Sequence, residues 1–295
     1  MSADQRRAYL YAGAAVLLWS TVASAFKLSL RHLRPDELLL WANVTSVVVL
    51  SGVAALARGK VPRFTGHRAL LRRGALGLLN PCLYYVVLFR AYDRLPAQEA
   101  QPLNYTWAVT LALLSIPLLK QRIGWKEIGS MLIGYVGVVV IATRGDLLGL
   151  RFESPLGVGL ALGSTVIWAL FWIYDRSSPG DPVQNLLVSF ICSLPPVLLV
   201  NFLTGTVRLP SWPGLLGAAY VGTFEMGITF VLWSRALKLS ETTARVGTLI
   251  FFSPFLSLVL IHFLVGERIL ASSIVGLVLI VLGNVLQQVV ARRTA

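Results

Sequence analysis

The side chains best suited to bind a small molecule lie inside apolar runs of the chain. Glu225 lies near the middle of one run, in the stretch GTFEMGITF. A carboxyl group in such a run is costly unless it is protonated, paired or hydrated, so we expect it to face the interior of a helix bundle. Its functional interpretation is a contact to a substrate amine or a proton-coupling group. The structural alternative is a hydrogen bond between helices made by a neutral acid.

A second pair of candidates, Asn104 and Trp107, is three residues apart and therefore shares one face of a helix. An amide and an indole on the same face can hold the polar and the apolar part of one small molecule. The alternative is that Asn104 joins two helices by a hydrogen bond across a tight packing interface.

Asn80 and Pro81 interrupt another apolar run just before two adjacent tyrosines, Tyr84 and Tyr85. Proline removes a backbone donor and kinks a helix. An interrupted helix frees carbonyl groups that can line a cavity. The alternative for the tyrosines is anchoring at a membrane interface. The remaining cavity candidates, three aromatic side chains and one hydroxyl, are Trp19, Trp168, Phe224 and Thr248. The two tryptophans lie at similar depths in two apolar runs, and the alternative for each is a bulky side chain that faces lipid.

One basic residue, Arg245, lies near the start of an apolar run, four residues after Glu241. The two side chains can form an ion pair along a helix. A contact from Arg245 to a substrate carboxylate is the functional alternative.

The composition of the chain indicates that membrane-spanning helices hold these residues. The chain of 295 residues is 56% hydrophobic and 13% charged, about half the charged fraction of a soluble domain. Charges cluster in short islands between apolar runs of about twenty residues, the length that crosses a bilayer as a helix. We expect an all-α polytopic membrane protein with ten spans, near residues 8–30, 36–57, 74–92, 98–119, 126–143, 155–175, 182–204, 213–235, 242–265 and 269–291.

The net charge of +13 is explained by orientation in the bilayer, and we expect no nucleic-acid partner. With the N-terminus in the cytoplasm, sixteen of the 26 Lys and Arg residues fall in cytoplasmic islands and eight in opposite ones. This bias predicts that both termini are cytoplasmic. Cys82 and Cys192 both fall inside apolar runs, and no Cys or His pair has metal-ligand spacing, so we expect no metal or other cofactor.

The chain repeats itself. At a shift of 144 residues Leu95 matches Leu239 and Ala100 matches Ala244, and the triplet at 20–22 recurs at 164–166. We therefore expect two five-span repeats, residues 1–145 and 150–295. Because five is odd, the second must be inverted in the membrane. Inverted repeats are typical of secondary transporters, with a substrate site between the halves and alternating access.

Several motifs add a family resemblance. Ser253-Pro254 opens an apolar run, Gly266-Glu267-Arg268 follows it, and a glycine-rich helix closes the chain. This pattern resembles the second domain of the drug/metabolite transporter (DMT) superfamily of EamA type. The runs 18–20 and 25–27 resemble the first span of the same family. The residues at 80–81, 84–85 and 103–107 resemble its aromatic amino-acid exporter branch, the YddG type.

The resemblance implies a ten-helix fold with a central cavity that exports amino acids or related metabolites through the bacterial inner membrane. The substrate would be a neutral or aromatic amino acid, and the alternative is a drug or nucleoside-like metabolite. An enzyme would need clustered His, Asp, Cys or Ser on facing helices, which the sequence does not suggest. The glycines of the closing helices, such as Gly137 and Gly283, indicate close packing in either a fixed core or a homodimer face.

Overall fold

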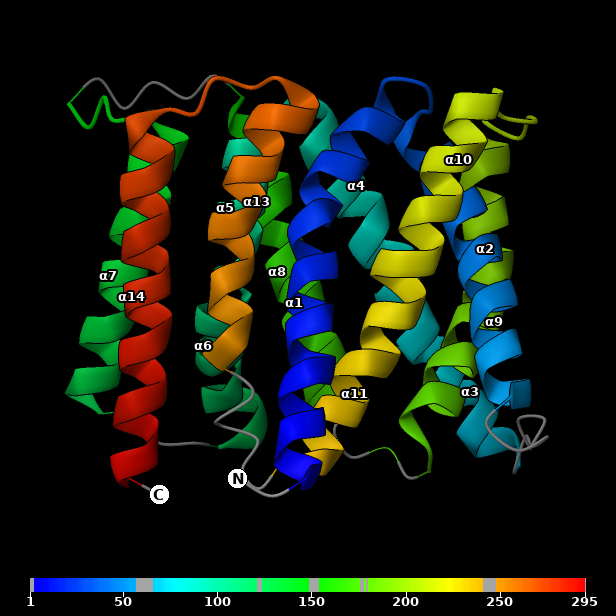
Figure 1. Cartoon of the computed structure of the whole chain (residues 1–295), viewed down its shortest axis with the longest axis horizontal. Helices are drawn as coiled ribbons and strands as arrows, with labels where there is room; N and C mark the ends of the chain where they lie inside the picture. The colour runs from blue at the N-terminus through cyan, green and yellow to red at the C-terminus, as the bar shows by residue number, and fades with distance from the viewer. Residues whose placement is uncertain are drawn as a thin grey trace.

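The computed structural model describes residues 3–56, 66–120, 124–148, 154–175, 178, 180–240 and 248–294. All regular elements in these ranges are helices, and most stand side by side with their axes roughly parallel (Figure 1). In the first half they are α1 (Ala3–Leu30), α2 (Pro35–Leu56), α3 (His67–Gly77), the π-helical segment η1 (Leu78–Leu83), α4 (Tyr84–Arg94), α5 (Ala97–Asn104), α6 (Trp107–Leu119) and α7 (Trp125–Ala142).

The second half begins at α8. Its elements are α8 (Pro155–Asp175), α9 (Pro182–Leu203), α10 (Trp212–Tyr220), the π-helical segment η2 (Val221–Ile228), α11 (Thr229–Leu239), the 3₁₀ segment η3 (Thr248–Phe252), α13 (Ser253–Leu260), the π-helical segment η4 (Ile261–Val265) and α14 (Ala271–Thr294). Helices suit this composition because they satisfy every backbone polar group within the segment, as lipid requires.

Seven helices in the described part of the chain are long and apolar enough to cross a membrane. They coincide with seven of the ten spans expected from the sequence, and the polytopic all-α architecture is confirmed. Shorter apolar helices, Ile128–Ala142, Leu249–Val265 and Ala271–Gln287, occupy the places of the other three. The full count of ten spans stays a prediction.

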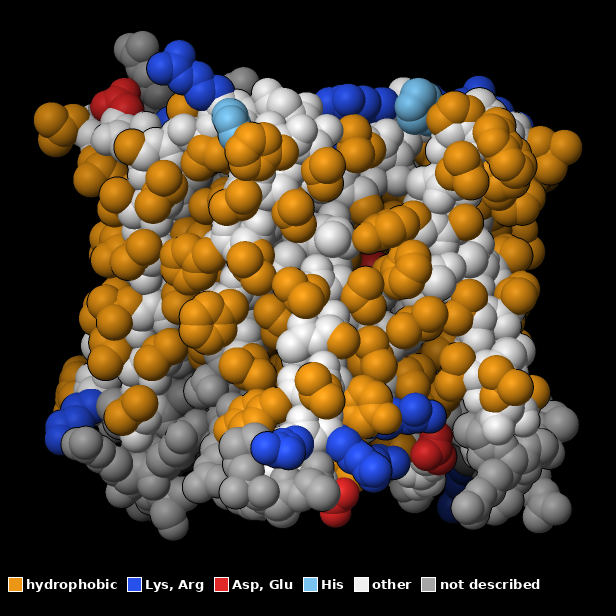
Figure 2. Space-filling model, in the orientation of Figure 1, with side chains coloured by type: hydrophobic (Ala, Val, Ile, Leu, Met, Phe, Trp, Pro, Cys, Tyr) orange, Lys and Arg blue, Asp and Glu red, His pale blue; other side chains and the backbone are white. Residues whose placement is uncertain are grey.

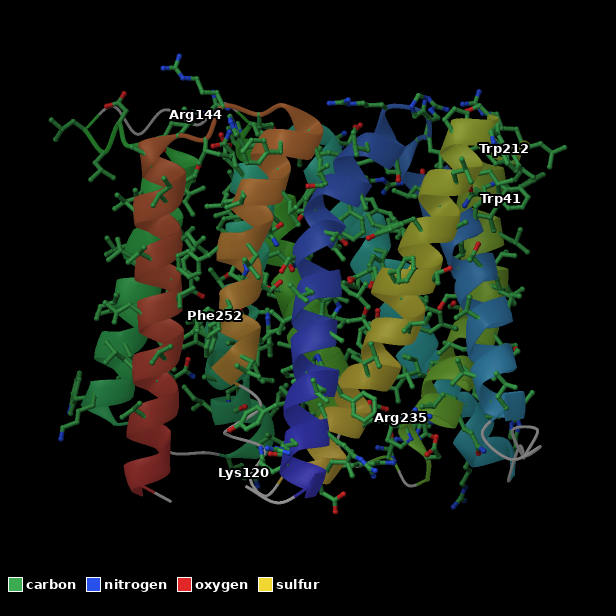
Figure 3. The ribbon with its side chains drawn as sticks, in the orientation of Figure 1. Trp41, Lys120, Arg144, Trp212, Arg235 and Phe252 are labelled. Atoms are coloured by element: carbon green, nitrogen blue, oxygen red, sulfur yellow. The ribbon has the colours of Figure 1, made fainter. Side chains whose placement is uncertain are left out.

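The surface has the layering of a membrane protein. In Figure 2 apolar side chains cover the middle of the visible face, and the charged side chains gather toward its upper and lower edges. Figure 3 places Arg144 at the upper edge and Lys120 and Arg235 at the lower edge. The start of α1 and the end of α14 both lie at the lower edge (Figure 1). This arrangement fits a helical layer immersed in lipid, with charges left in water at both sides.

Two of the long helical runs are interrupted near mid-height. Asn80 has the extended angles φ −140° and ψ 119° within η1, so the run from α3 to α4 is broken where the sequence predicts an interruption. The run from α10 to α11 contains η2, which carries Glu225. A π-helical segment changes the direction in which the following side chains point.

Close packing joins α7 and α14, the two helices at one end of the row in Figure 1. A Cβ atom placed on Gly137 would lie 2.5 Å from the carbonyl oxygen of Gly276. A Cβ on Gly283 would lie 2.7 Å from the carbonyl oxygen of Ser130. The helices therefore approach so closely that only glycine fits at these contacts.

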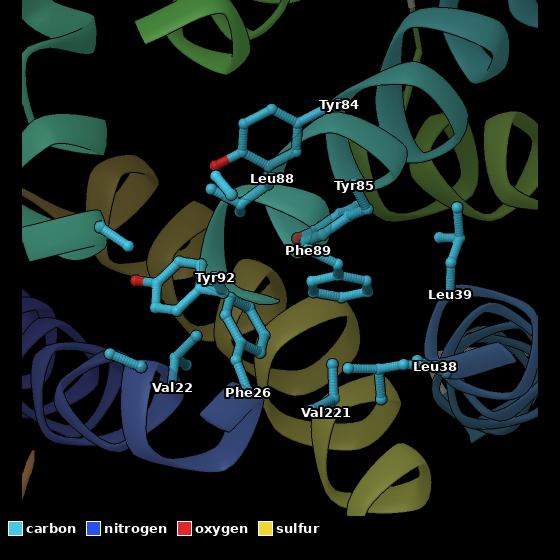
Figure 4. Close-up of a cluster of buried hydrophobic side chains, with 14 of the residues drawn as sticks. Val22, Phe26, Leu38, Leu39, Tyr84, Tyr85, Leu88, Phe89, Tyr92 and Val221 are labelled. Carbon is cyan, nitrogen blue, oxygen red and sulfur yellow. The ribbon is translucent and has the colours of Figure 1, made fainter. Parts of the chain in front are cut away.

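The main apolar core lies between α1, α2, α4 and the second half of the chain. Phe26 packs edge-on against Phe89 and Tyr92, with ring centroids 4.9 and 5.1 Å apart. In the close-up of Figure 4 the hydroxyls of Tyr84 and Tyr92 point to the same side, away from Leu38 and Leu39. That side carries the cavity described next.

Candidate functional site

A cavity of about 260 Å³ lies between the two halves of the chain and is lined by both. From the first half come Trp19, Val22, Ala23, Phe26, Tyr84, Leu88, Tyr92, Gln101, Asn104, Tyr105, Trp107 and Ala108; from the second come Trp168, Trp172, Glu225, Phe230, Trp233, Ile250, Phe251 and Asn284. These residues belong to the predicted spans one, three, four, six, eight, nine and ten.

Helical spacing explains how so many elements contribute. Trp19, Val22, Ala23 and Phe26 fall at positions i, i+3, i+4 and i+7, so they form one stripe along α1. In the same way Tyr84, Leu88 and Tyr92 are four residues apart on α4, and Trp168 and Trp172 are four apart on α8.

The wall is mainly aromatic. Trp19 packs edge-on against Trp233 and Phe230, with centroids 5.4 and 5.8 Å apart. Trp168 packs against Tyr84 at 4.6 Å and against Phe230 at 6.0 Å. Rings at these separations attract one another by about 0.5–1.5 kcal/mol beyond the burial of their area. The rings from both halves thus form one connected wall.

Glu225 supplies the acidic group of the wall. Its side chain comes from η2, and the residue is 9% exposed. The hydroxyl of Tyr85, itself fully buried, donates to Oε1 of Glu225 at 3.0 Å. The second oxygen, Oε2, is buried and has no hydrogen-bond partner among the described residues. One carboxyl oxygen is thus held from behind, and the other has no described hydrogen-bond partner.

Three amides complete the polar lining. Asn104 donates from Nδ2 to Ser164 Oγ at 2.9 Å and accepts from the Tyr84 hydroxyl at 3.3 Å. Asn284 donates from Nδ2 to the Tyr105 carbonyl at 3.2 Å. Asn284 Oδ1 and Gln101 Oε1 are buried and, within the described structure, accept no hydrogen bond. Buried acceptors in this condition favour a ligand that brings donors.

The ten residues predicted from the sequence fall into two groups. Six of them line the cavity: Trp19, Tyr84, Asn104, Trp107, Trp168 and Glu225. Tyr85 lies behind the wall, where it bonds to Glu225 and packs against Phe89 at 5.2 Å.

The other three predicted residues, Asn80, Phe224 and Thr248, are not among the residues that line the described cavity. Asn80 is fully buried at the helix break, and Phe224 packs against Tyr220 at 4.8 Å outside the lining. The Thr248 side chain and the whole of Arg245 lie outside what the structure describes.

Sequence reasoning did not select several residues of the wall. The aromatic ones lie one or two helical turns from other wall residues, and this helical spacing could have identified them: Tyr92, Trp172, Phe230 and Trp233. Asn284 lies on a closing helix that the sequence marks as scaffold, and no local signal distinguishes it.

Polar contacts at the upper edge join the two halves. The Glu267 carboxylate accepts from the backbone N–H groups of Ala97 at 2.8 Å and Gln98 at 3.1 Å, at the start of α5. The Gln98 side chain donates to the Arg268 carbonyl at 2.9 Å and accepts from the Leu270 N–H at 2.8 Å. We call these four hydrogen bonds the upper clamp.

Ion pairs lie at the same edge. Arg90 pairs with Asp36 at 2.9 Å, and Arg144 pairs with Glu99 at 2.7 Å. Arg208, in a loop outside the spans, bonds to Glu37, and this hydrogen bond raises the pKa of the guanidinium above its ordinary value. Arg208 therefore stays protonated at any ordinary pH. Among the described residues no group of three or more His, Cys, Asp or Glu side chains could hold a metal ion.

The apolar helices and the cavity define a polytopic membrane protein with a largely aromatic cavity between its halves. The chain belongs to the EamA-like transporter family, whose model matches residues 6–143 and 155–287. It is a transporter by family, and the superfamily expected from the sequence motifs is confirmed.

Individual proteins agree with this assignment. The chain is 32% identical over 183 residues to an uncharacterised transporter in the sor 3′ region of Acidianus ambivalens, covering 57% of this chain and 66% of that protein. It is 28% identical over 254 residues to the aromatic amino acid exporter YddG of Ancylobacter novellus, covering 84% and 85%. A solved crystal structure at 24% identity matches with a TM-score of 0.68 over 97% of this chain and 98% of that one, which shows the fold.

Proposed function

We propose that this protein is a secondary exporter of neutral and aromatic amino acids. The substrate occupies the aromatic cavity, and the halves move against each other to expose it alternately to the two sides of the bacterial inner membrane. The observation that carries the proposal is the cavity itself, which both halves line and which combines an aromatic wall with a few polar groups.

The size and chemistry of the cavity support a small apolar substrate. A volume of about 260 Å³ is just below the roughly 300–1,000 Å³ range of small-molecule sites. Apolar contact discriminates weakly between similar ligands, so this wall should accept several aromatic or branched side chains. The relative from Ancylobacter novellus, named as an aromatic amino acid exporter, supports the same class.

The positions of the helix breaks support two inverted repeats, 1–145 and 150–295. Shifted by 144 residues, η1 (Leu78–Leu83) corresponds to 222–227, which lies within η2 (Val221–Ile228). Tyr105 and Thr106, the break between α5 and α6, correspond to 249 and 250, within η3. The family model also matches once in each half. Five spans per half would place both termini on the same side of the membrane, and the bias of Lys and Arg makes that side the cytoplasm.

Glu225 is the proposed site of proton coupling and of contact to the substrate amine. It is the acidic residue of the described wall, and one of its oxygens has no described partner. A carboxyl group in this position can hold a proton or a substrate ammonium, but not both at once, which is the competition that a proton antiporter needs.

The experiment is a substrate panel with purified protein in proteoliposomes. We expect movement of labelled tryptophan, phenylalanine and leucine, accelerated by a proton gradient. Movement of cationic drugs or nucleosides without amino acids would favour the alternative exporter and refute this proposal. In Glu225→Gln we expect the gradient to lose its effect. If transport and its pH dependence are unchanged, Glu225 is a structural residue.

A further inference from the structure

The charges around the cavity are unbalanced. Glu225 is acidic, and none of the twenty residues that line the described cavity is Lys, Arg or His. A cation close behind the wall, Lys27, uses its ammonium to donate to the Tyr92 carbonyl at 2.6 Å and is not part of the lining. The described wall therefore offers a charged partner to an ammonium group and none to a carboxylate.

The polar atoms of the wall that lack a described hydrogen-bond partner show the same asymmetry. Three buried oxygens of the wall lack a described partner, namely Glu225 Oε2, Gln101 Oε1 and Asn284 Oδ1. Each of the three can accept a hydrogen bond, and an ammonium group is a donor without any acceptor. On the donor side the unpartnered group in the described wall is the indole N–H of Trp172. A hydrogen bond from a neutral donor stabilises a buried carboxylate much less than a hydrogen bond from a cation does.

The aromatic rings add to the preference for a cation. Trp19, Trp168 and Phe230 are linked by ring contacts of 5.8 and 6.0 Å and share the cavity with Glu225. A cation over a ring face is attracted by about 0.5–2 kcal/mol, and most strongly by Trp. A carboxylate gains nothing from these faces, and Glu225 repels it whenever Glu225 is ionised.

We propose that this cavity recognises a substrate by its ammonium group and its aromatic side chain, and that the substrate carboxylate is dispensable. Arylalkylamines, the amines that correspond to decarboxylated aromatic amino acids, are therefore substrates in their own right. They bind at least as tightly as the parent amino acids. The inference rests on the proposed function of the cavity and specifies what the cavity selects.

The test is equilibrium binding to the purified full chain by calorimetry, with three compounds that share an indole ring. Tryptamine has the ammonium alone, tryptophan has both groups, and 3-indolepropionate has the carboxylate alone. We expect tryptamine to bind as tightly as tryptophan or more tightly, and 3-indolepropionate to bind at least tenfold more weakly than either.

Glu225→Gln removes the charge and keeps the size of the side chain. We expect it to weaken tryptamine binding by about 10- to 100-fold, the loss of a hydrogen bond to a charged group. Binding of 3-indolepropionate should be unchanged or tighter, which a general loss of folding would not produce. Asp93→Asn, which removes a carboxylate 47% exposed at the edge, should change neither. If Glu225→Gln does not fold, the order of the three compounds on the wild type still decides the question.

Two results would overturn the inference. Tryptophan binding tenfold tighter than tryptamine would show a cationic partner for the carboxylate, the role that the sequence suggests for Arg245. Equal binding of tryptamine and 3-indolepropionate would show that charge is not selected. Either result, with tryptophan transport intact, leaves the proposed function standing. Tight tryptamine binding without amino-acid transport would support the inference and refute the proposed amino-acid export.

Discussion

Replacing Glu267 by alanine should open the upper clamp without touching the cavity. Its carboxylate accepts from the N–H groups of Ala97 and Gln98 and so caps the start of α5 from the other half of the chain. The first N–H groups of a helix have no partner within the helix. The substitution leaves these two N–H groups to bond to water, and it removes the charged group that accepts from them.

The magnitude follows from the geometry. Losing a side-chain cap costs about 0.5–2 kcal/mol. Losing an acidic group at a helix N-terminus costs a further 0.3–1 kcal/mol, roughly. Glu267 is half-buried at the edge, so water offsets part of this loss. A net cost of about 1–3 kcal/mol raises the population with the clamp open by about 5- to 150-fold.

The assay is hydrogen exchange at the backbone amide of Leu270, measured on protein in lipid nanodiscs. This N–H bonds to the Gln98 side chain at 2.8 Å, so Glu267→Ala leaves its acceptor in place. Faster exchange at Leu270 therefore reports opening of the clamp and not the loss of its own bond. Asp93→Ala, at the same edge, is the matched control and should leave this exchange unchanged.

The reasoning would be refuted by unchanged exchange at Leu270 together with faster exchange at Ala97 and Gln98. Glu267 would then be a local helix cap that does not hold the two halves together.

Two further substitutions test packing and the support of the site. Gly137→Ala should reduce the free energy of unfolding by about 1–3 kcal/mol relative to Gly129→Ala on the same helix, because only the first Cβ would meet Gly276, at 2.5 Å; equal effects in denaturant titrations would refute the close contact. Tyr85→Phe removes the hydroxyl that donates to Glu225 and should cost about 0.5–1.5 kcal/mol if the acid is neutral and 1.5–3 kcal/mol if it is ionised. The same denaturant titrations measure this cost. The cost should vanish in a Glu225→Leu background. If it persists there, the Tyr85 hydroxyl has another partner.

Much of the architecture could be predicted because lipid imposes simple constraints on sequence. Apolar length indicates the helices, and Asn80-Pro81 marks the broken run because proline cannot continue the hydrogen-bond ladder. Trp19 and Trp168 could be proposed as cavity walls because they match in depth between the halves. Each of these signals is local in the sequence.

The direction of a side chain at a helix break could not be predicted. Tyr84 lines the cavity and Tyr85 lies behind it, although both follow the same interruption. Which of two neighbours faces inward depends on the rotation that η1 introduces, and no local pattern encodes it. Phe224 and Glu225 are neighbours within η2, and in the same way the first lies outside the lining and the second within it.

Asn284 illustrates the other limit of sequence reasoning. The glycines of α14 correctly indicate close packing against α7, and they conceal that another face of the same helix reaches the cavity. A polar residue on an otherwise apolar helix can face either a neighbouring helix or a cavity, and only the assembled bundle distinguishes the two.

The central claim is that the aromatic cavity carries the substrate, and two adjacent phenylalanines test it most directly. Phe251 lines the cavity and is 8% exposed, whereas Phe252, which is labelled in Figure 3, is 62% exposed and is not part of the lining. We predict that tryptophan transport in proteoliposomes, measured as kcat/KM, falls by about tenfold or more in Phe251→Ala, the loss expected from an apolar contact of about 1.5–3 kcal/mol. Phe252→Ala should transport tryptophan like the wild type. Equal transport by the two folded variants would contradict the claim that the substrate passes through this cavity.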